Sequence, residues 1–379
     1  MAAQNNLMMI ASADGSPQTE HAIASQVARY NQPKIKRSDF RDDFVFGAAT
    51  SAYQIEGGWN AGSKGMSNWD VYTLKEPDLF SFSSLLNLLI GLEGGISDGS
   101  NGCVAIDNMF RISTLSLNSY RFSIAWSRIL PGGRLCTGIN KEGIKFYNDL
   151  IDALLAACIE PYVTIFHWDV PQCLEEEYGG FLSDIIVKDF CKFVEICFWE
   201  FGDRVKYWIT LNEPWSFRKN MALFPLITVN IQQLQEEYVN GSFPPNHGKH
   251  PTTTGEATNL HKWIHLYIQE SQVGKIGMTN YIQWYEPLTD SKEDHDLLLG
   301  DLILCWDEPL VIGDYPESMI TNVGQRLLKF TEKEEKLVKG FYDFLGIKYY
   351  TASYATSDPT KPTADSYLTD SHILALRKY

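Results

Sequence analysis

The sequence lacks an apolar run long enough to cross a membrane. Its most apolar stretch, residues 79–92, carries serine and asparagine and is shorter than the ~20 residues that a membrane-spanning helix needs. The first 38 residues are polar and have no basic start, so they are predicted to be a flexible arm and not a signal peptide. These absences predict a protein without a membrane span, located in the cytoplasm.

An excess of basic residues is also missing. The 47 Asp and Glu residues outnumber the 32 Lys and Arg residues, the net charge is -15, and no stripe of basic residues alternates with aromatic ones. Nucleic acid is therefore excluded as a partner, because its phosphates would be repelled. The short basic cluster at 34–37 is typical of a solvated linker, although it leaves a nuclear location open.

The sequence contains no paired cysteines, metal-ligand spacings or glycine-rich phosphate loops. Its seven cysteines are scattered without a Cys-x-x-Cys pair, a pattern typical of reduced thiols in the cytosol. The glycine pairs at 94–95 and 132–133 are interpreted as turns. We therefore expect no metal ion and no cofactor.

What the sequence does contain is a series of strand-like segments, most of them followed by a helix-like stretch. The segments are residues 44–50, 119–126, 162–168, 205–212, 275–284 and 344–351. Between them, residues 141–157 and 184–201 carry apolar residues at helical spacing. Strands that alternate with helices predict an α/β fold with a parallel sheet and helical crossovers.

One of these strands ends in Asn212, Glu213 and Pro214. Glycoside hydrolysis with retention of configuration needs an acid that protonates the leaving oxygen and a second carboxylate roughly 5 Å away. Glu213 can be the acid, Asn212 can hydrogen-bond a sugar hydroxyl, and Pro214 ends the strand. The tripeptide alone is more typical of a turn after a strand, but its place at a strand end favours the catalytic interpretation.

Five short motifs follow one another along the chain. They are Ser-Ala-Tyr-Gln-Ile-Glu-Gly at 51–57, Tyr-Arg-Phe-Ser-Ile-Ala-Trp-Ser-Arg at 120–128, Phe-His-Trp-Asp-Val-Pro-Gln at 166–172, Tyr-Gly-Gly-Phe at 178–181 and Thr-Leu-Asn-Glu-Pro at 210–214. Together they resemble the family 1 β-glucosidases, and within that family the plant alkaloid and secoiridoid glucosidases. The resemblance implies a (β/α)8 TIM-barrel domain over residues 39–356 that removes glucose from a plant alkaloid or terpenoid β-glucoside.

The same resemblance implies roles for individual residues. Gln54, His167 and Asn212 would hold sugar hydroxyls, Trp168 would form an apolar wall under the sugar ring, Glu213 would act as general acid and then as general base, and Tyr350 would lie against the nucleophile. The chemistry agrees, because amides and a neutral imidazole offer both donors and acceptors to hydroxyl groups. A mostly apolar pocket with a few placed polar groups is typical of small-molecule sites.

The nucleophile itself is not found. After Glu213 no strand end of the Thr-Glu-Asn-Gly type occurs, and Glu286, Asp307 and Glu308 are interpreted as structural strand and loop ends. Lys348 stands where the resemblance implies an asparagine, and residues 80–97 interrupt a region that is continuous in the family. About six of the eight strands can be placed, so we expect an incomplete barrel and a poor hydrolase.

An incomplete barrel has two open sheet edges, and each unmet backbone group costs about 1–3 kcal/mol if it is buried. We expect residues 357–379, interpreted as a loose tail, to cover an edge, or the chain to pair as a homo-oligomer or with full-length relatives, or the chain to be only marginally folded. Two functions follow. The chain is either a retaining β-glucosidase or a catalytically inactive sugar-binding or regulatory partner of full-length glucosidases.

Overall fold

The computed structural model describes residues 36–75, 117–183, 185–213, 274–292, 294, 344–357 and 373–377, together with single positions and short pieces between 311 and 343. The chain divides into two units, residues 1–45 and 46–379. In the first unit, a short 3-10 helix, η1 (Arg37–Asp39), precedes the rings of Phe40 and Phe44, which lie 4.7 Å apart. The fold and the site described below belong to the second unit.

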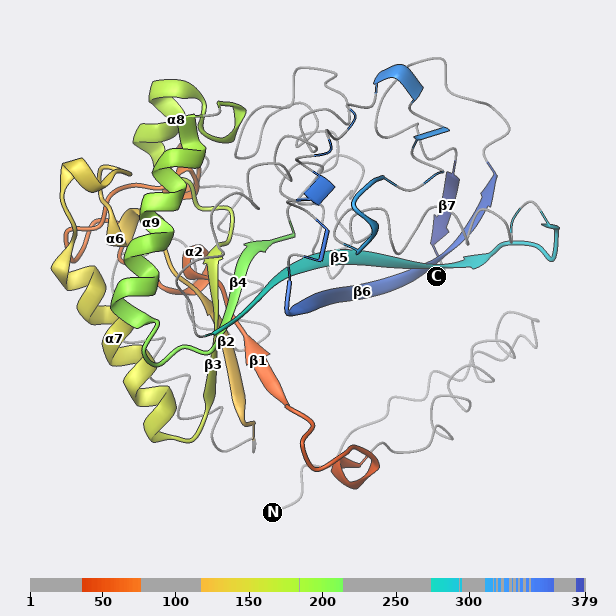
Figure 1. Cartoon of the computed structure of the whole chain (residues 1–379), viewed down its shortest axis with the longest axis horizontal. Helices are drawn as coiled ribbons and strands as arrows, with labels where there is room; N and C mark the ends of the chain where they lie inside the picture. The colour runs from red at the N-terminus through yellow and green to blue at the C-terminus, as the bar shows by residue number, and fades with distance from the viewer. Residues whose placement is uncertain are drawn as a thin grey trace, which may run out of the picture. The chain divides into compact units, whose positions relative to one another are not determined.

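The second unit is built on a seven-stranded sheet whose strands follow one another in chain order (Figure 1). The strands are β1 (Gly47–Ala49), β2 (Ser119–Ser123), β3 (Glu160–Phe166), β4 (Tyr207–Asn212), β5 (Lys275–Pro287), β6 (Phe344–Ser357) and β7 (Ile373–Arg377). Strands β1 to β6 are parallel to their neighbours, and β7 is antiparallel to β6. The six strands expected from the sequence are confirmed, although β5 and β6 extend further than expected.

The sheet is open within the described residues, where β1 pairs with β2 alone. A parallel six-stranded sheet with helical crossovers is the expected part of a (β/α)8 barrel. The prediction of an incomplete barrel with six recognisable strands is therefore confirmed for this part of the chain.

Strand β7 departs from the expected loose tail. Ile373–Arg377 lies within residues 357–379 and pairs with Ser353–Ser357 of β6. Four of its five residues are apolar, and pairing satisfies backbone groups at the edge of β6. The end of the chain thus covers the last part of that edge, which is one of the ways expected for an open barrel.

Helices cover one face of the sheet (Figure 1). In chain order, the helical elements of the second unit are α2 (Ala52–Ile55), α3 (Asn68–Lys75), α6 (Trp126–Ile129), η2 (Leu135–Thr137), α7 (Lys141–Ala156), α8 (Gln172–Tyr178), η3 (Gly180–Leu182), α9 (Ile185–Phe201) and η4 (Gly324–Arg326). Asn140 caps α7, since its side chain accepts a hydrogen bond from the Glu142 amide at 3.1 Å. The same side chain donates to the carbonyls of Gly62 and Arg128, so that the start of α7 is tied to the loop at Gly62 and to α6.

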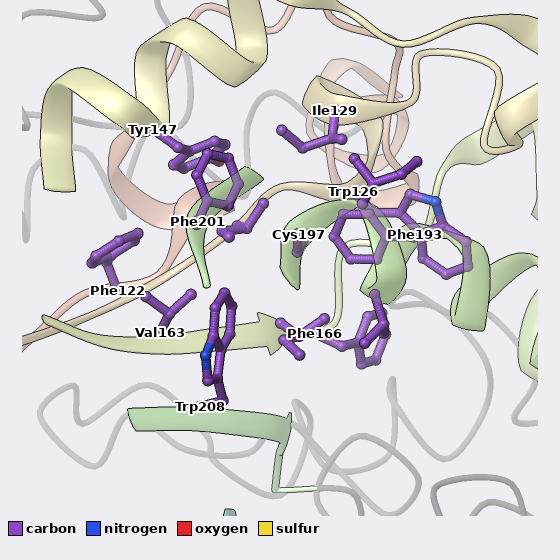
Figure 2. Packing of buried hydrophobic residues seen from close by; sticks show 14 of the residues in the cluster. Phe122, Trp126, Ile129, Tyr147, Val163, Phe166, Phe193, Cys197, Phe201 and Trp208 are labelled. Carbon is purple, nitrogen blue, oxygen red and sulfur yellow. The ribbon is translucent and has the colours of Figure 1, made fainter. Parts of the chain in front are cut away.

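The core lies between the sheet and helices α7 and α9, and its residues point toward one another in Figure 2. Trp126 stacks on Phe193 with ring centroids 5.1 Å apart, and Trp208 meets Phe198 edge-on at 4.8 Å. Trp126, Trp208 and Phe193 are fully buried. This packing holds the strand ends of β2, β3 and β4 in a fixed arrangement.

From the sequence, Trp199 and Phe201 are interpreted as residues that pack on a face of α9, and for Trp199 this interpretation is wrong. Phe201 is fully buried, whereas 87% of Trp199 is exposed. Residues two apart on a helix point roughly 200° apart, so they do not share a face. The two aromatic residues therefore belong to opposite sides of α9.

No helix among the described residues is both long and apolar enough to span a membrane. Within the same residues no group of three or more His, Cys, Asp or Glu side chains is arranged to hold a metal ion. The described cysteines, Cys136, Cys158, Cys173, Cys191 and Cys197, are free thiols. Residues 80–97, Asp307 and Glu308 lie outside the described residues.

Candidate active site

The carboxyl ends of β3 and β4 carry four of the candidate residues. His167 and Trp168 directly follow β3, Asn212 is the last residue of β4, and Glu213 comes next. Because parallel strands end at the same edge of a sheet, this edge is where barrel enzymes hold their chemistry. All four side chains are buried.

A bulge in β4 decides where Asn212 points. Tyr207 lies on the sheet face away from Trp208, since its ring stacks on Tyr162 at 4.4 Å. Simple alternation would place Asn212 with Trp208, but the register with β5 shifts between Ile209 and Asn212. The side chain of Asn212 therefore accepts a hydrogen bond from Arg121 Nη2 at 2.7 Å.

Arg121 is held on this face by a second contact. Its Nε donates to Thr164 Oγ1 of β3 at 2.8 Å, so the guanidinium bridges β3 and β4. Arg121 is a site residue that the sequence reasoning did not single out. The available signal was a charged residue in the middle of an otherwise apolar strand, which is expensive to bury without a purpose.

Trp168 joins the ends of β3 and β4. Its backbone has a φ of 76°, an uncommon value for a residue with a side chain. Its indole Nε1 donates to the carbonyl of Asn212 at 2.6 Å, and its own carbonyl accepts from Asn68 Nδ2 at 3.3 Å. The strained backbone of Trp168 is stabilised by these contacts on either side.

Glu213 also has a positive φ, 43°, and its amide donates to the carbonyl of Thr279 in β5 at 2.7 Å. Its carboxylate Oε1 lies 2.9 Å from the ammonium Nζ of Lys348 in β6. The exposed fractions of the two side chains are 2% for Glu213 and 21% for Lys348. The structure thus brings Lys348 into direct contact with the proposed acid.

His167 lies close to the same charges. Burial lowers its pKa well below the usual 6.5, and the positive charges of Arg121 and Lys348 lower it further. The ring edge meets Tyr53 of α2 with centroids 5.9 Å apart, and Tyr53 stacks on Trp69 at 4.8 Å. His167 is therefore a neutral imidazole at physiological pH.

The neutral His167 predicts a loss of stability in acid. In the unfolded chain the imidazole binds a proton near pH 6.5, whereas in the folded chain it stays neutral to lower pH. The contribution of neutral His167 to the free energy of unfolding is therefore present above pH 6.5 and is lost as the pH falls. Between pH 7 and pH 5 we expect His167 alone to lower the free energy of unfolding by at most about 2 kcal/mol. Urea unfolding at both pH values should show this difference, and His167→Gln should reduce it. An equal decrease in the variant would contradict the prediction.

The two remaining predicted site residues are placed less completely. Gln54 lies in α2, which follows β1, and its Oε1 accepts a hydrogen bond from Ser51 Oγ at 2.5 Å. Its neighbour Tyr53 reaches His167, so α2 borders the site. The backbone of Tyr350 belongs to β6, but its side chain lies outside the described part of the structure. The proposed roles of both residues stay predictions.

A second acid, Asp169, follows β3 but belongs to a different group. Burial raises its pKa well above the usual value, and the charges that act on it are those of Glu56, Lys64 and Asp70. Glu286, another carboxylate considered from the sequence, is an exposed residue of β5. Glu213 is therefore the carboxylate, among the described residues, that the strand ends place beside Asn212.

Comparisons with known proteins agree with this arrangement. The glycosyl hydrolase family 1 model matches residues 36–375. Oleuropein beta-glucosidase of Olea europaea is 53% identical over 97% of this chain and 69% of its own length, and raucaffricine-O-beta-D-glucosidase of Rauvolfia serpentina is 43% identical over 90% and 66%.

Solved structures show the same relationship. A rice Os3BGlu6 beta-glucosidase has a TM-score of 0.68 and 33% identity over 90% of this chain and 71% of its own, and an aphid myrosinase has a TM-score of 0.71 and 29% identity over 89% and 72%. The chain spans about two thirds of the length of the relatives that it matches. With a buried Asn-Glu pair at the end of the fourth parallel strand and 53% identity to a curated relative, the chain belongs to glycosyl hydrolase family 1.

Proposed function

We propose that this protein hydrolyses a plant β-glucoside with retention of configuration, with Glu213 as its acid and base. The observation that carries the proposal is the buried Glu213 at the end of β4, next to Asn212 and held by the Thr279 carbonyl. The names of the two curated relatives, oleuropein beta-glucosidase and raucaffricine-O-beta-D-glucosidase, favour a glucoside with a large alkaloid or terpenoid aglycone.

In this reaction the residues divide the work. Glu213 protonates the oxygen that leaves with the aglycone and later removes a proton from the attacking water. Asn212 presents its amide to a sugar hydroxyl while Arg121 fixes its orientation. Neutral His167 offers one donor and one acceptor, and Gln54 offers an amide from the border of the site.

A complete retaining site also needs a nucleophilic carboxylate roughly 5 Å from the acid. Among the described residues Glu213 is the carboxylate that occupies the strand ends, and Asp169 lies with Glu56, Lys64 and Asp70 instead. The alternative function, an inactive sugar-binding or regulatory partner, would follow if no other group serves as nucleophile. The relatives that match the chain are named as glucoside-cleaving enzymes, which favours hydrolysis over this alternative.

The test is an assay of the purified chain with 4-nitrophenyl β-glucoside, with the α-glucoside as control and with oleuropein as a second substrate. Sodium azide is included in parallel reactions, because this small anion can attack the sugar where a carboxylate is missing. Release of glucose from the β-glucosides alone would support the proposal. Turnover that needs azide would indicate an assembled site without its nucleophile, and no turnover by folded protein in either condition would favour the binding function.

A further inference from the structure

Lys348 occupies the inner face of the site. Phe344, four residues earlier in β6, contacts the rings of Tyr162 and Tyr207 on the face that also carries Arg121. Residues four apart on a strand share a face, so Lys348 lies on that side as well. Ile347 and Tyr349 point the other way and are more than half exposed, at 59% and 57%.

The side chain of Lys348 has one close acidic partner. Its Nζ lies 2.9 Å from Glu213 Oε1, and both groups are largely withdrawn from water. An ammonium group carries three donors and no acceptor, whereas an ionised carboxylate only accepts. The contact is therefore that of an ammonium donor with a carboxylate acceptor, and the nearest transferable proton to Glu213 is carried by Lys348.

That location matters for the first step of hydrolysis. Glu213 must deliver a proton to the leaving oxygen, yet as a carboxylate it holds none. Lys348 can replace this proton, because burial and the positive charge of Arg121 lower the pKa of its ammonium, while Glu213 opposes the decrease. The lysine therefore gives up its proton more readily than an ordinary surface lysine does.

We propose that Lys348 is a positioning residue that stores the proton which Glu213 passes to the leaving oxygen. The inference rests on the proposed glucosidase function. In the first step the ammonium of Lys348 gives its proton to the Glu213 carboxylate as Glu213 protonates the leaving oxygen. The bond between that oxygen and the anomeric carbon breaks, the aglycone departs as a neutral alcohol, and the anomeric carbon bonds to the nucleophilic carboxylate that the proposed function requires, or to added azide, until water displaces it. In the second step Glu213 takes a proton from the attacking water and returns one to the Lys348 amine.

The charged surroundings are consistent with such an exchange. Among the described residues, the groups that act on Lys348 are Arg121 of β2 and Glu213 after β4, and Lys348 in turn acts on His167 after β3. From β5, the residue that contacts Glu213 is the uncharged Thr279. Neutral His167 does not compete for the proton in the range where Lys348 titrates.

The first measurement follows the ionisation of Lys348 directly and does not depend on turnover. Protein labelled with 13C at the lysine ε-carbons is titrated by NMR, and the Lys348 signal is identified by its absence from the Lys348→Arg variant. We expect Lys348 to titrate below the other lysines, and at still lower pH in Glu213→Gln, because the carboxylate that favours the ammonium is lost. A Lys348 titration that is identical with and without the Glu213 carboxylate would overturn the proposal.

The second measurement separates proton storage from simple charge. Arginine keeps the positive charge but does not release its proton. Lys348→Arg should therefore lose hydrolytic activity in the same way as Lys348→Met. For both variants we expect the loss of kcat/KM on an alkyl β-glucoside to exceed the loss on 2,4-dinitrophenyl β-glucoside by about tenfold or more, since only the alkyl leaving group needs a proton. Full activity of Lys348→Arg on the alkyl glucoside would refute proton storage.

The matched control is Lys206→Met, which removes an exposed lysine that pairs with Glu160. Lys206→Met should change kcat/KM by the same factor on both substrates. If the wild-type chain turns over neither substrate, with or without azide, then the glucosidase function fails, while the NMR titration still decides whether Lys348 and Glu213 share a proton.

Discussion

Glu213→Gln is expected to slow the hydrolysis of an alkyl β-glucoside by about 10²–10⁴ in kcat/KM, because general acid–base catalysis contributes about that factor. Glutamine has the shape of glutamate but cannot donate a proton from a carboxyl group. The Thr279 carbonyl should still accept the hydrogen bond from the amide of residue 213, so the fold of the site should be retained. Initial rates over a range of substrate concentrations, with circular dichroism as a check on folding, give the result.

The matched control for this prediction is Glu286→Gln on β5. Glu286 is exposed, and it was interpreted from the sequence as a structural strand end. Its replacement should leave hydrolysis within about twofold of the wild type, as is usual for surface substitutions away from a site. A large loss in Glu286→Gln with little loss in Glu213→Gln would mean that the acid has been assigned to the wrong strand.

Arg128→Met is expected to lower the free energy of unfolding by about 3–5 kcal/mol, because it leaves a buried carboxylate without its counter-charge. Arg128 Nε lies 3.0 Å from Glu56 Oε2, and both side chains are less than a tenth exposed. The hydroxyl of Tyr147 in α7 donates to Glu56 Oε1 at 2.9 Å, so Glu56, which follows α2, is also linked to α7. A loss of this size is a large share of the roughly 5–15 kcal/mol that stabilises a typical protein.

The loss of stability in Arg128→Met should depend on pH. Burial raises the pKa of Glu56, and Arg128 opposes that increase, so removal of Arg128 should raise the pKa further. A carboxyl group whose pKa is raised in the folded state stabilises the fold at low pH. This stabilisation is lost as the pH rises through the pKa of the folded state. The cost of Arg128→Met should therefore be smaller at pH 5 than at pH 8.

Urea unfolding at the two pH values measures the effect. Lys145→Met, which removes one partner of the exposed pair with Asp149, serves as control and should cost no more than about 0.5 kcal/mol. The double variant Glu56→Leu with Arg128→Met should lose less than the sum of the two single changes, because neither charge is then left alone. Strict additivity, or an Arg128→Met cost as small as that of the control, would show that the buried pair does not act as described.

The amino-acid sequence by itself determined where the six parallel strands lie along the chain and the position of Glu213 at a strand end. Both depend on local signals, namely apolar segments that alternate with amphipathic helices and the Asn-Glu-Pro run that follows one of them. The motifs at 51–57, 120–128 and 166–172 also indicated the family, and the comparisons with known proteins confirmed this assignment.

Only the tertiary structure decided which of these residues meet. The bulge against β5 turns Asn212 toward Arg121, and β7 adds to the edge of β6. Lys348, which the sequence offered only as an unexpected lysine, reaches Glu213 across β5, because β4 and β6 both pair with that strand and Glu213 follows the end of β4. Periodicity along one segment cannot report such contacts, since they depend on strand register and on partners that are distant in the chain.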